Sequence, residues 1–255
     1  MRRLVHLAAP LALIGLLLAA WEIGCRALHV PTYFLAPPSA VAVSLVEDAP
    51  GLVKAAWYTL SSALMALVIA SLLAQLLALA VVLSNSLERA VQPLAVVLQV
   101  TPVIAIAPLV SIWAGTDHPG RAVVALAVVV AFFPIYSGAL AGLKSVDPDL
   151  MRLFDLYGAS PAQRLTRLRI PSAVPFLLQG HKVAAGLAIV GAVVAEFVAG
   201  SGKVQGLAWR IFDASFKLQT ARMLAALAVL GAMGAVLYAL LDALERAGLA
   251  WWRGR

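Results

Sequence analysis

Six apolar stretches, each long enough to cross a lipid bilayer, constrain this chain more than any other feature. They run approximately over residues 4–21, 56–83, 94–114, 122–143, 180–199 and 223–244. A helix of about 20 apolar residues crosses the hydrocarbon layer and satisfies its own backbone hydrogen bonds there. Hydrophobic residues make up 63% of the chain and charged residues 12%, far from the balance of soluble domains. The sequence therefore predicts an all-α integral membrane protein with six transmembrane helices, in which residues 1–255 form a single transmembrane domain.

The first stretch, residues 4–21, has two interpretations: a signal peptide or a first transmembrane helix. It is longer than the apolar part of a usual signal peptide, and Glu22 disfavours a lipoprotein cleavage site before Cys25. We therefore expect an uncleaved helix. The proline-containing residues 29–53 follow as an external segment, with a short surface helix around residues 40–46.

Prolines interrupt the third and fourth stretches. Pro102 and Pro108 lie within the third stretch, and Pro134 lies within the fourth. Each proline removes a backbone donor, and irregular backbone at membrane depth is tolerated only where protein or a cavity surrounds it. We expect a helix break at each of the two places, with a cavity between them.

The polar segment from Val146 to Pro171 lies between the fourth and fifth stretches and has the signals of two short helices. Asp147 followed by Pro148 is typical of a helix start, and Gly158 is placed to end that helix. A second start follows at Ser160, whose capping-box partner is Gln163. Pro171 is expected to stop or kink this second helix.

The first of these two helices has an apolar face, formed by Leu150, Leu153, Phe154 and Tyr157. This face suits a partner protein that offers a groove. It also suits an interfacial helix lying on anionic lipid, and the residues alone leave both interpretations open.

The distribution of basic residues predicts the orientation. With six spans, both termini lie on one side of the membrane, and twelve of the 19 lysines and arginines fall on that side. Both termini and residues 146–171 are therefore expected in the cytoplasm. The formal net charge of +7 does not indicate a nucleic-acid partner, because the basic residues cluster beside the apolar stretches, where they set topology.

Polar and aromatic side chains within the stretches are candidates for a solute pathway. Glu196 is an ionisable group near the outer end of an apolar helix, which indicates either a pathway residue or a carboxylate that reaches the outer interface. The aromatic residues offer stacking surface for a planar solute, although helix packing or lipid contact explains them equally well. The pathway candidates are Gln99, Thr101, Trp113, Phe133, Tyr136 and Glu196.

No motif in the sequence supports enzymatic chemistry. The chain lacks the glycine-rich G-x4-G-K-[S/T] motif, so any ATP that is used must be bound by another chain. It has one cysteine and no cysteine and histidine spacing typical of a metal site. The four histidines lie near predicted span ends and are interpreted as interfacial. We expect a protein that is not an enzyme and carries no cofactor of its own.

The spacing of Gly158, Leu168, Ile170 and Pro171 resembles the loop signature of ABC importer permeases, through which such permeases dock on an ATPase. The chain departs from that signature where Arg152-Leu153-Phe154 replaces Glu-Ala-Ala. The resemblance implies a cytoplasmic coupling-helix loop between spans 4 and 5. The implied docking residues are Arg152, Leu153, Phe154, Tyr157, Gly158, Ala159, Leu168, Ile170 and Pro171.

Residues 35–244 as a whole resemble the nitrate, sulfonate and taurine permeases. Ala195-Glu196-Phe197, before the glycine-rich Gly200-Ser201-Gly202, is most similar to the branch linked to thiamine-precursor pyrimidines and flavins. This implies a type I ABC importer permease of the bacterial inner membrane that forms a homodimer. Its implied partners, besides membrane lipid, are cytoplasmic ATPases that bind ATP and magnesium and a periplasmic or lipid-anchored substrate-binding protein.

Two functional classes fit the sequence. The first is the permease subunit of an ATP-driven importer for a small solute such as a pyrimidine, flavin, sulfonate, taurine or nitrate. The predicted spans have no fixed positive charge near mid-membrane, which favours a neutral or ring-bearing solute over a bare anion. The alternative is an ion-coupled secondary carrier that works without an ATPase, although such carriers usually have inverted repeats and this chain shows none.

Overall fold

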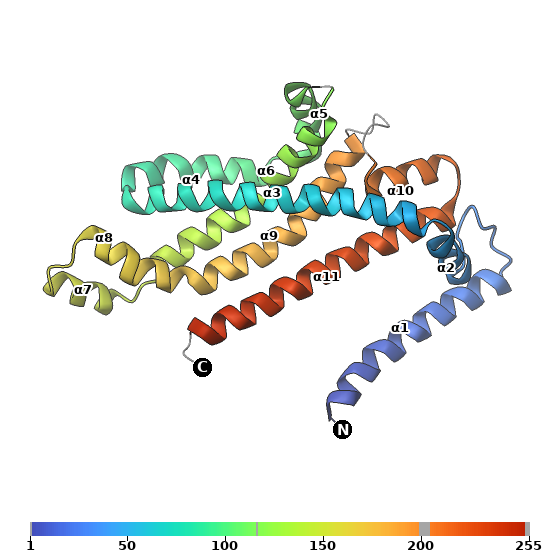
Figure 1. Ribbon diagram of the computed structural model, residues 1–255, viewed down its shortest axis with the longest axis horizontal. Helices are drawn as coiled ribbons and strands as arrows, with labels where there is room; N and C mark the ends of the chain where they lie inside the picture. The colour runs from blue at the N-terminus through green and yellow to red at the C-terminus, as the bar shows by residue number, and fades with distance from the viewer. Residues whose placement is uncertain (1, 116, 199–204, 253–255) are drawn as a thin grey trace. The chain divides into compact units, whose positions relative to one another are not determined.

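The computed structural model describes residues 2–115, 117–198 and 205–252, and within these ranges the chain is helical and has no strand (Figure 1). This confirms the all-α prediction. The glycine-rich turn at residues 200–202 lies outside the described residues. The helices are α1 Arg2–Ala27, α2 Pro38–Glu47, α3 Ala49–Leu83, α4 Asn85–Val100, α5 Val103–Ala114, α6 Pro119–Lys144, α7 Pro148–Leu156, α8 Pro161–Arg164, the π-helix η1 Leu165–Arg169, α9 Ile170–Val198, α10 Leu207–Phe216 and α11 Thr220–Trp252.

Four helical segments are long and apolar enough to cross a membrane: Ala49–Leu83, Pro119–Lys144, Pro161–Val198 and Thr220–Ala250. A fifth candidate is the pair α4 and α5, which is bent by 101° and forms either a broken span or a re-entrant loop. The described residues thus hold four or five candidate spans. The first predicted stretch falls in α1, whose side chains are described only from residue 12, and six spans remain a prediction.

The two expected proline breaks have different outcomes. The break at Pro102 is confirmed, because α4 ends at Val100 and α5 begins at Val103. The break at Pro134 is wrong, because α6 continues through this residue without interruption. A single proline removes one hydrogen bond from a helix of 26 residues, and the packing of α6 against α9 holds the helix together on both sides of it.

Two compact units make up the chain: Met1–Tyr58 with Gln205–Ala232, and Thr59–Val204 with Met233–Arg255. In the first unit, α2 begins after Pro37, which has no side chain able to cap a helix. The carboxylate of Glu22 takes this role, because it accepts hydrogen bonds from the backbone N–H of Ser39 (2.9 Å) and from its hydroxyl (2.8 Å). The expected short surface helix is therefore present, and a carboxylate from α1 stabilises its start.

The second unit is built around the close packing of α6 against α9 (Figure 1). Gly138 and Gly142 form a G-x-x-x-G pair on α6, and this spacing allows helix backbones to approach closely in membranes. A Cβ atom added to Gly142 would lie 2.8 Å from the Cα atom of Ala173, and one added to Gly180 would lie 2.9 Å from the carbonyl oxygen of Pro134. The two backbones therefore meet where glycine leaves room for them.

Polar side chains connect α9 to two further helices of this unit. His181 lies 2.7 Å from the hydroxyl of Ser71 on α3, so it bridges two helices and is not the interfacial histidine that the sequence suggested. The next residue, Lys182, forms ion pairs with Asp242 (2.5 Å) and Glu245 (2.9 Å) of α11. The side-chain exposure of these three charged groups is only 13–21%, so the two carboxylates offset the lysine within the helix contact.

Candidate functional site

Residues 146–171 form a helical hairpin whose local structure follows from its sequence. The first helix, α7, begins where Asp147 accepts a hydrogen bond of 2.8 Å from the backbone N–H of Asp149, which confirms the expected start. At the other end, Gly158 has φ +63°, a left-handed conformation that glycine adopts at low cost. The N–H of Gly158 donates to Asp155 O, and the N–H of Ala159 donates to Phe154 O, both at 3.0 Å. This is the Schellman arrangement, and it confirms Gly158 as the end of the helix.

The second helix, α8, begins with the expected capping box. The Ser160 hydroxyl accepts from the N–H of Gln163 (3.3 Å), and the Gln163 side chain accepts from the N–H of Ser160 (2.8 Å). The guanidinium of Arg164 joins the two helices, because it forms an ion pair of 2.5 Å with Asp155 and donates to Ala159 O at 3.0 Å. Backbone hydrogen bonds at the end of α7, the capping box at the start of α8 and the ion pair of Arg164 therefore stabilise the turn between the two helices.

Pro171 was expected to stop or kink the second helix, and it does not stop it. Instead, α8 passes through the π-helix Leu165–Arg169 into α9, and the three together form one segment of 38 residues. In a regular α-helix the proline ring would clash with the carbonyl of the residue four positions earlier, here Arg167. The wider π turn immediately before Pro171 relieves this clash, as shown by the Ile170 N–H, which donates to Leu165 O. The hairpin is thus continuous with a helical segment long and apolar enough to cross a membrane.

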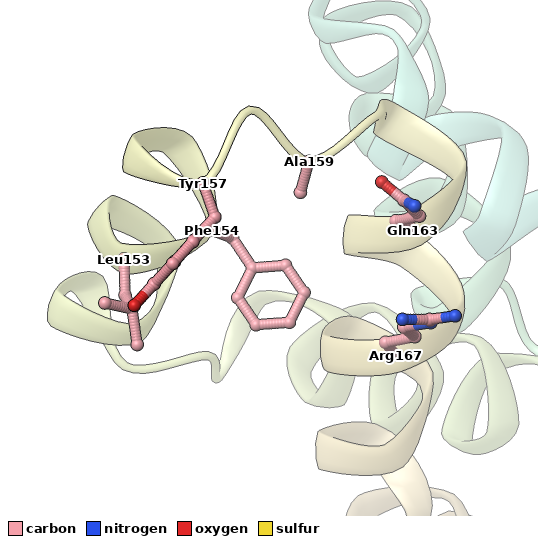
Figure 2. A pocket seen from close by; sticks show the side chains of 6 residues that line it. All are labelled: Leu153, Phe154, Tyr157, Ala159, Gln163 and Arg167. Atoms are coloured by element: carbon pink, nitrogen blue, oxygen red, sulfur yellow. The ribbon is translucent and has the colours of Figure 1, made fainter.

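An open groove of about 310 Å³ lies between α7 and the following helical turns. Figure 2 shows Phe154 extending from α7 toward the opposite helix, which carries Gln163 and Arg167. Apolar side chains in and beside the groove are exposed: Tyr157, which lines the groove, is 83% exposed, and Leu156, which does not line it, is 85% exposed. The groove is lined by Leu153, Phe154, Tyr157, Ala159, Gln163 and Arg167.

The structure brings together some of the expected docking residues and separates others from them. Leu153, Phe154, Tyr157 and Ala159 meet in the groove, whereas Leu168 is buried and does not line it. Sequence reasoning missed Gln163 and Arg167 as groove residues. Their spacing of four residues, which places them on one helix face, was the available signal.

The pathway candidates are spread over four helices, α4, α5, α6 and α9, and the break between α4 and α5. Gln99 and Trp113 are exposed, and Phe133 is half-buried. Thr101 donates to the carbonyl of Val97 at 2.6 Å, which satisfies a group in the turn before the break. The role of these candidates as a pathway remains a prediction.

Tyr136 is the most buried aromatic candidate, with 3% exposure. Its ring stacks on that of Phe132, with centroids 5.8 Å apart and planes 8° from parallel. Among the described groups, its hydroxyl has no hydrogen-bond partner. A buried hydroxyl of this kind is costly unless a partner arrives, and a solute or a second protein chain would supply one.

Glu196 is fully buried, and its carboxylate accepts a hydrogen bond of 2.7 Å from the hydroxyl of Thr59 on α3. The interpretation of Glu196 as a side chain reaching the outer interface is therefore wrong. The hydrogen bond between Thr59 and Glu196 also joins α3 to α9 near the C-terminal end of α9. Among the described residues, no group of three or more histidine, cysteine or acidic side chains could hold a metal ion.

The long apolar helices and the bent helix pair are those of a multi-pass membrane protein, and the helical hairpin adds an exposed groove with apolar walls. The chain belongs to the family described as binding-protein-dependent transport system inner membrane components, which matches residues 66–247. It is thus an ABC importer permease subunit. Members of this family are transport components rather than catalytic subunits, and ATP hydrolysis takes place on other chains of the system.

Three relatives illustrate the similarity. A probable ABC transporter permease protein of Haemophilus influenzae is 30% identical over 93% of this chain and 95% of its own length. The formylaminopyrimidine transport permease protein of Halalkalibacterium halodurans is 30% identical over 98% of both chains. The riboflavin transport system permease protein of Chloroflexus aurantiacus is 33% identical over 65% of this chain and 60% of its own length. Family membership weighs against the alternative of an ion-coupled carrier.

Proposed function

We propose that this permease docks on a cytoplasmic ATPase through residues 146–171 and imports a small ring-bearing solute. In this proposal the chain has six spans, with α1 as the first and the bent pair α4 and α5 as the third. Both termini lie in the cytoplasm of a bacterial cell, and two copies of the chain form the pathway. A substrate-binding protein delivers the solute on the outer side.

The observation that carries the proposal is the open groove between α7 and the helical turns that follow it. The length of the continuous helical segment indicates how far this groove lies from the membrane. The segment Pro161–Val198 has 38 residues, so its length is roughly 57 Å, whereas the hydrocarbon layer is about 30 Å thick. If the apolar end at Val198 lies at the outer edge of this layer, about 20 residues cross it and the inner edge falls near Gln179. The hairpin then projects into water, where its exposed apolar side chains need a protein surface.

This geometry favours a protein partner over the interfacial helix on anionic lipid. Headgroups extend roughly 5–7 Å beyond each side of the hydrocarbon layer. Arg167 lies twelve residues before Gln179 and so about 18 Å beyond the inner edge, well past the headgroups. An apolar helix face at this distance fits the helix-in-groove mode of recognition.

The preference for a ring-bearing solute rests on two features of the described chain. The pathway candidates are polar and aromatic, and no lysine or arginine without an ion-pair partner lies in the predicted spans close to them. Lys182, which lies near the inner edge, is already paired with two carboxylates. Tyr136 offers a stacked ring and a hydroxyl without a partner among the described groups. Relatives named for formylaminopyrimidine and riboflavin transport carry solutes of this chemical kind.

The substitution Phe154→Asp tests the docking proposal. It places a charge in the groove, and we expect it to reduce copurification of the ATPase with the permease while leaving the permease in the membrane. The matched control is Ala162→Asp, which adds the same charge at an exposed position of α8 outside the groove and should leave copurification unchanged. A Phe154→Asp complex with normal composition and normal solute-stimulated ATP hydrolysis would show that this hairpin is not the docking element.

A further inference from the structure

The groove carries a positive charge that no other described residue neutralises. Of its six lining residues, only Arg167 is charged. The nearby carboxylates have partners, since Asp149 pairs with Arg152 at 3.2 Å and Asp155 pairs with Arg164 at 2.5 Å. Within the described part of the chain, the guanidinium of Arg167 has no ion-pair partner, and the side chain is exposed. The groove therefore combines apolar walls with one available cation.

With Val198 at the outer edge of the hydrocarbon layer, as proposed above, an anion from the membrane is out of reach of this cation. The inner edge of that layer then falls about 18 Å from Arg167, and the headgroup layer occupies roughly the first 5–7 Å of that distance. An extended arginine side chain does not cover the remainder. The anion that meets Arg167 must therefore come from the water-exposed side, where the docking partner lies.

We propose that the groove binds an acidic segment of the ATPase subunit, with a carboxylate of the ATPase paired to Arg167 and an apolar side chain packed on Phe154. This inference rests on the proposed docking function and names the chemistry of its partner. Arginine presents a planar fork of donors that matches a carboxylate with two parallel hydrogen bonds. A partner that covers the groove also removes water from the pair, so the interaction becomes stronger and more specific than one on an open surface.

The pairing gives the hairpin a means to select its own ATPase. Leu153, Phe154 and Tyr157 offer apolar contact area to almost any apolar partner surface. By contrast, a partner that covers Arg167 without placing an acidic residue opposite it buries an unpaired charge, which lowers its affinity. An ATPase with a basic residue in this place would meet like charges within the covered groove. Arg167 is thus a specificity-determining residue of the docking surface.

The test measures binding of purified ATPase to the permease in nanodiscs of zwitterionic lipid, and repeats the measurement in nanodiscs that also contain anionic lipid. Arg167→Glu should weaken binding by at least about 30-fold, which corresponds to the lower end of about 2–5 kcal/mol for breaking a covered charge pair. Arg167→Lys should retain most of the affinity. The matched control is Arg89→Glu, which reverses an exposed charge on α4 outside the groove and should change binding by less than about threefold. Lysine substitutions at acidic surface residues of the ATPase should include one that restores binding to Arg167→Glu.

Four outcomes separate this inference from the proposed function. Normal binding by Arg167→Glu, in a system where Phe154→Asp abolishes binding, overturns the inference and leaves docking intact. Normal binding by both variants overturns docking as well. Equal losses in Arg167→Glu and Arg89→Glu would indicate a general charge effect, and a loss seen only with anionic lipid would indicate a headgroup site; either result overturns the inference. Thermal unfolding of Arg167→Glu at the wild-type temperature excludes a folding defect.

Discussion

The contact between α6 and α9 predicts that one added methyl group at Gly142 destabilises the protein. A Cβ atom at this position would lie 2.8 Å from the Cα atom of Ala173 and 2.9 Å from the Cβ atom of Phe176. Both neighbours are at or next to the backbone, so neither can move away without shifting a helix. Overpacking of this kind costs about 1–3 kcal/mol, which lowers the unfolding temperature of a chain of this size by roughly 2–12 °C.

The matched control is Gly186→Ala on α9, because a Cβ atom there meets no atom within 4 Å. Alanine favours a helix over glycine by up to about 1 kcal/mol, so this variant should unfold at the wild-type temperature or slightly above it. Intrinsic tryptophan fluorescence of the purified permease in detergent, recorded during heating, measures both variants. Equal unfolding temperatures for Gly142→Ala and Gly186→Ala would refute the close approach of α6 and α9.

Three further predictions address the charges, the pathway and the orientation. Lys182→Met should lower the unfolding temperature, because it leaves two poorly exposed carboxylates without their shared cation; an unchanged melting curve would contradict this. Tyr136→Phe removes the unpartnered hydroxyl but keeps the stacked ring, so it should slow solute uptake in vesicles without loosening the ATPase, and wild-type uptake would remove the hydroxyl from the pathway. In a Cys25-free background, a cysteine introduced at Asp117 should react with an impermeant thiol reagent from outside the cell and one introduced at Gln163 should not; the reverse pattern would overturn the orientation.

Local structure was predictable from the sequence because neighbouring residues determine it. The helix start at Asp147, the left-handed turn at Gly158 and the capping box at Ser160 each depend on groups within about five residues. The break at Pro102 was predictable for the same reason. The G-x-x-x-G spacing of Gly138 and Gly142 is also a local signal in the sequence, although it was not among the predicted features.

Features that depend on distant contacts could not be predicted. Whether a proline interrupts a helix depends on what packs beside it, so Pro134 remains helical although Pro102 does not. The burial of Glu196 depends on Thr59, which is 137 residues away in the chain. The groove around Arg167 likewise requires two helices, and no single helical face reveals it.

Photocrosslinking from Tyr157 tests the central claim, that this hairpin contacts the ATPase, most directly. Tyr157 is 83% exposed and lines the groove, so there is room at this position for the larger aromatic probe p-benzoylphenylalanine. The matched control places the same probe at Phe216, an aromatic residue that is 74% exposed and is expected on the outer side. In membranes containing the assembled complex, the probe at Tyr157 should form a crosslinked product with the ATPase and the probe at Phe216 should form none. A complex that copurifies intact while Tyr157 crosslinks only to lipid would contradict the account.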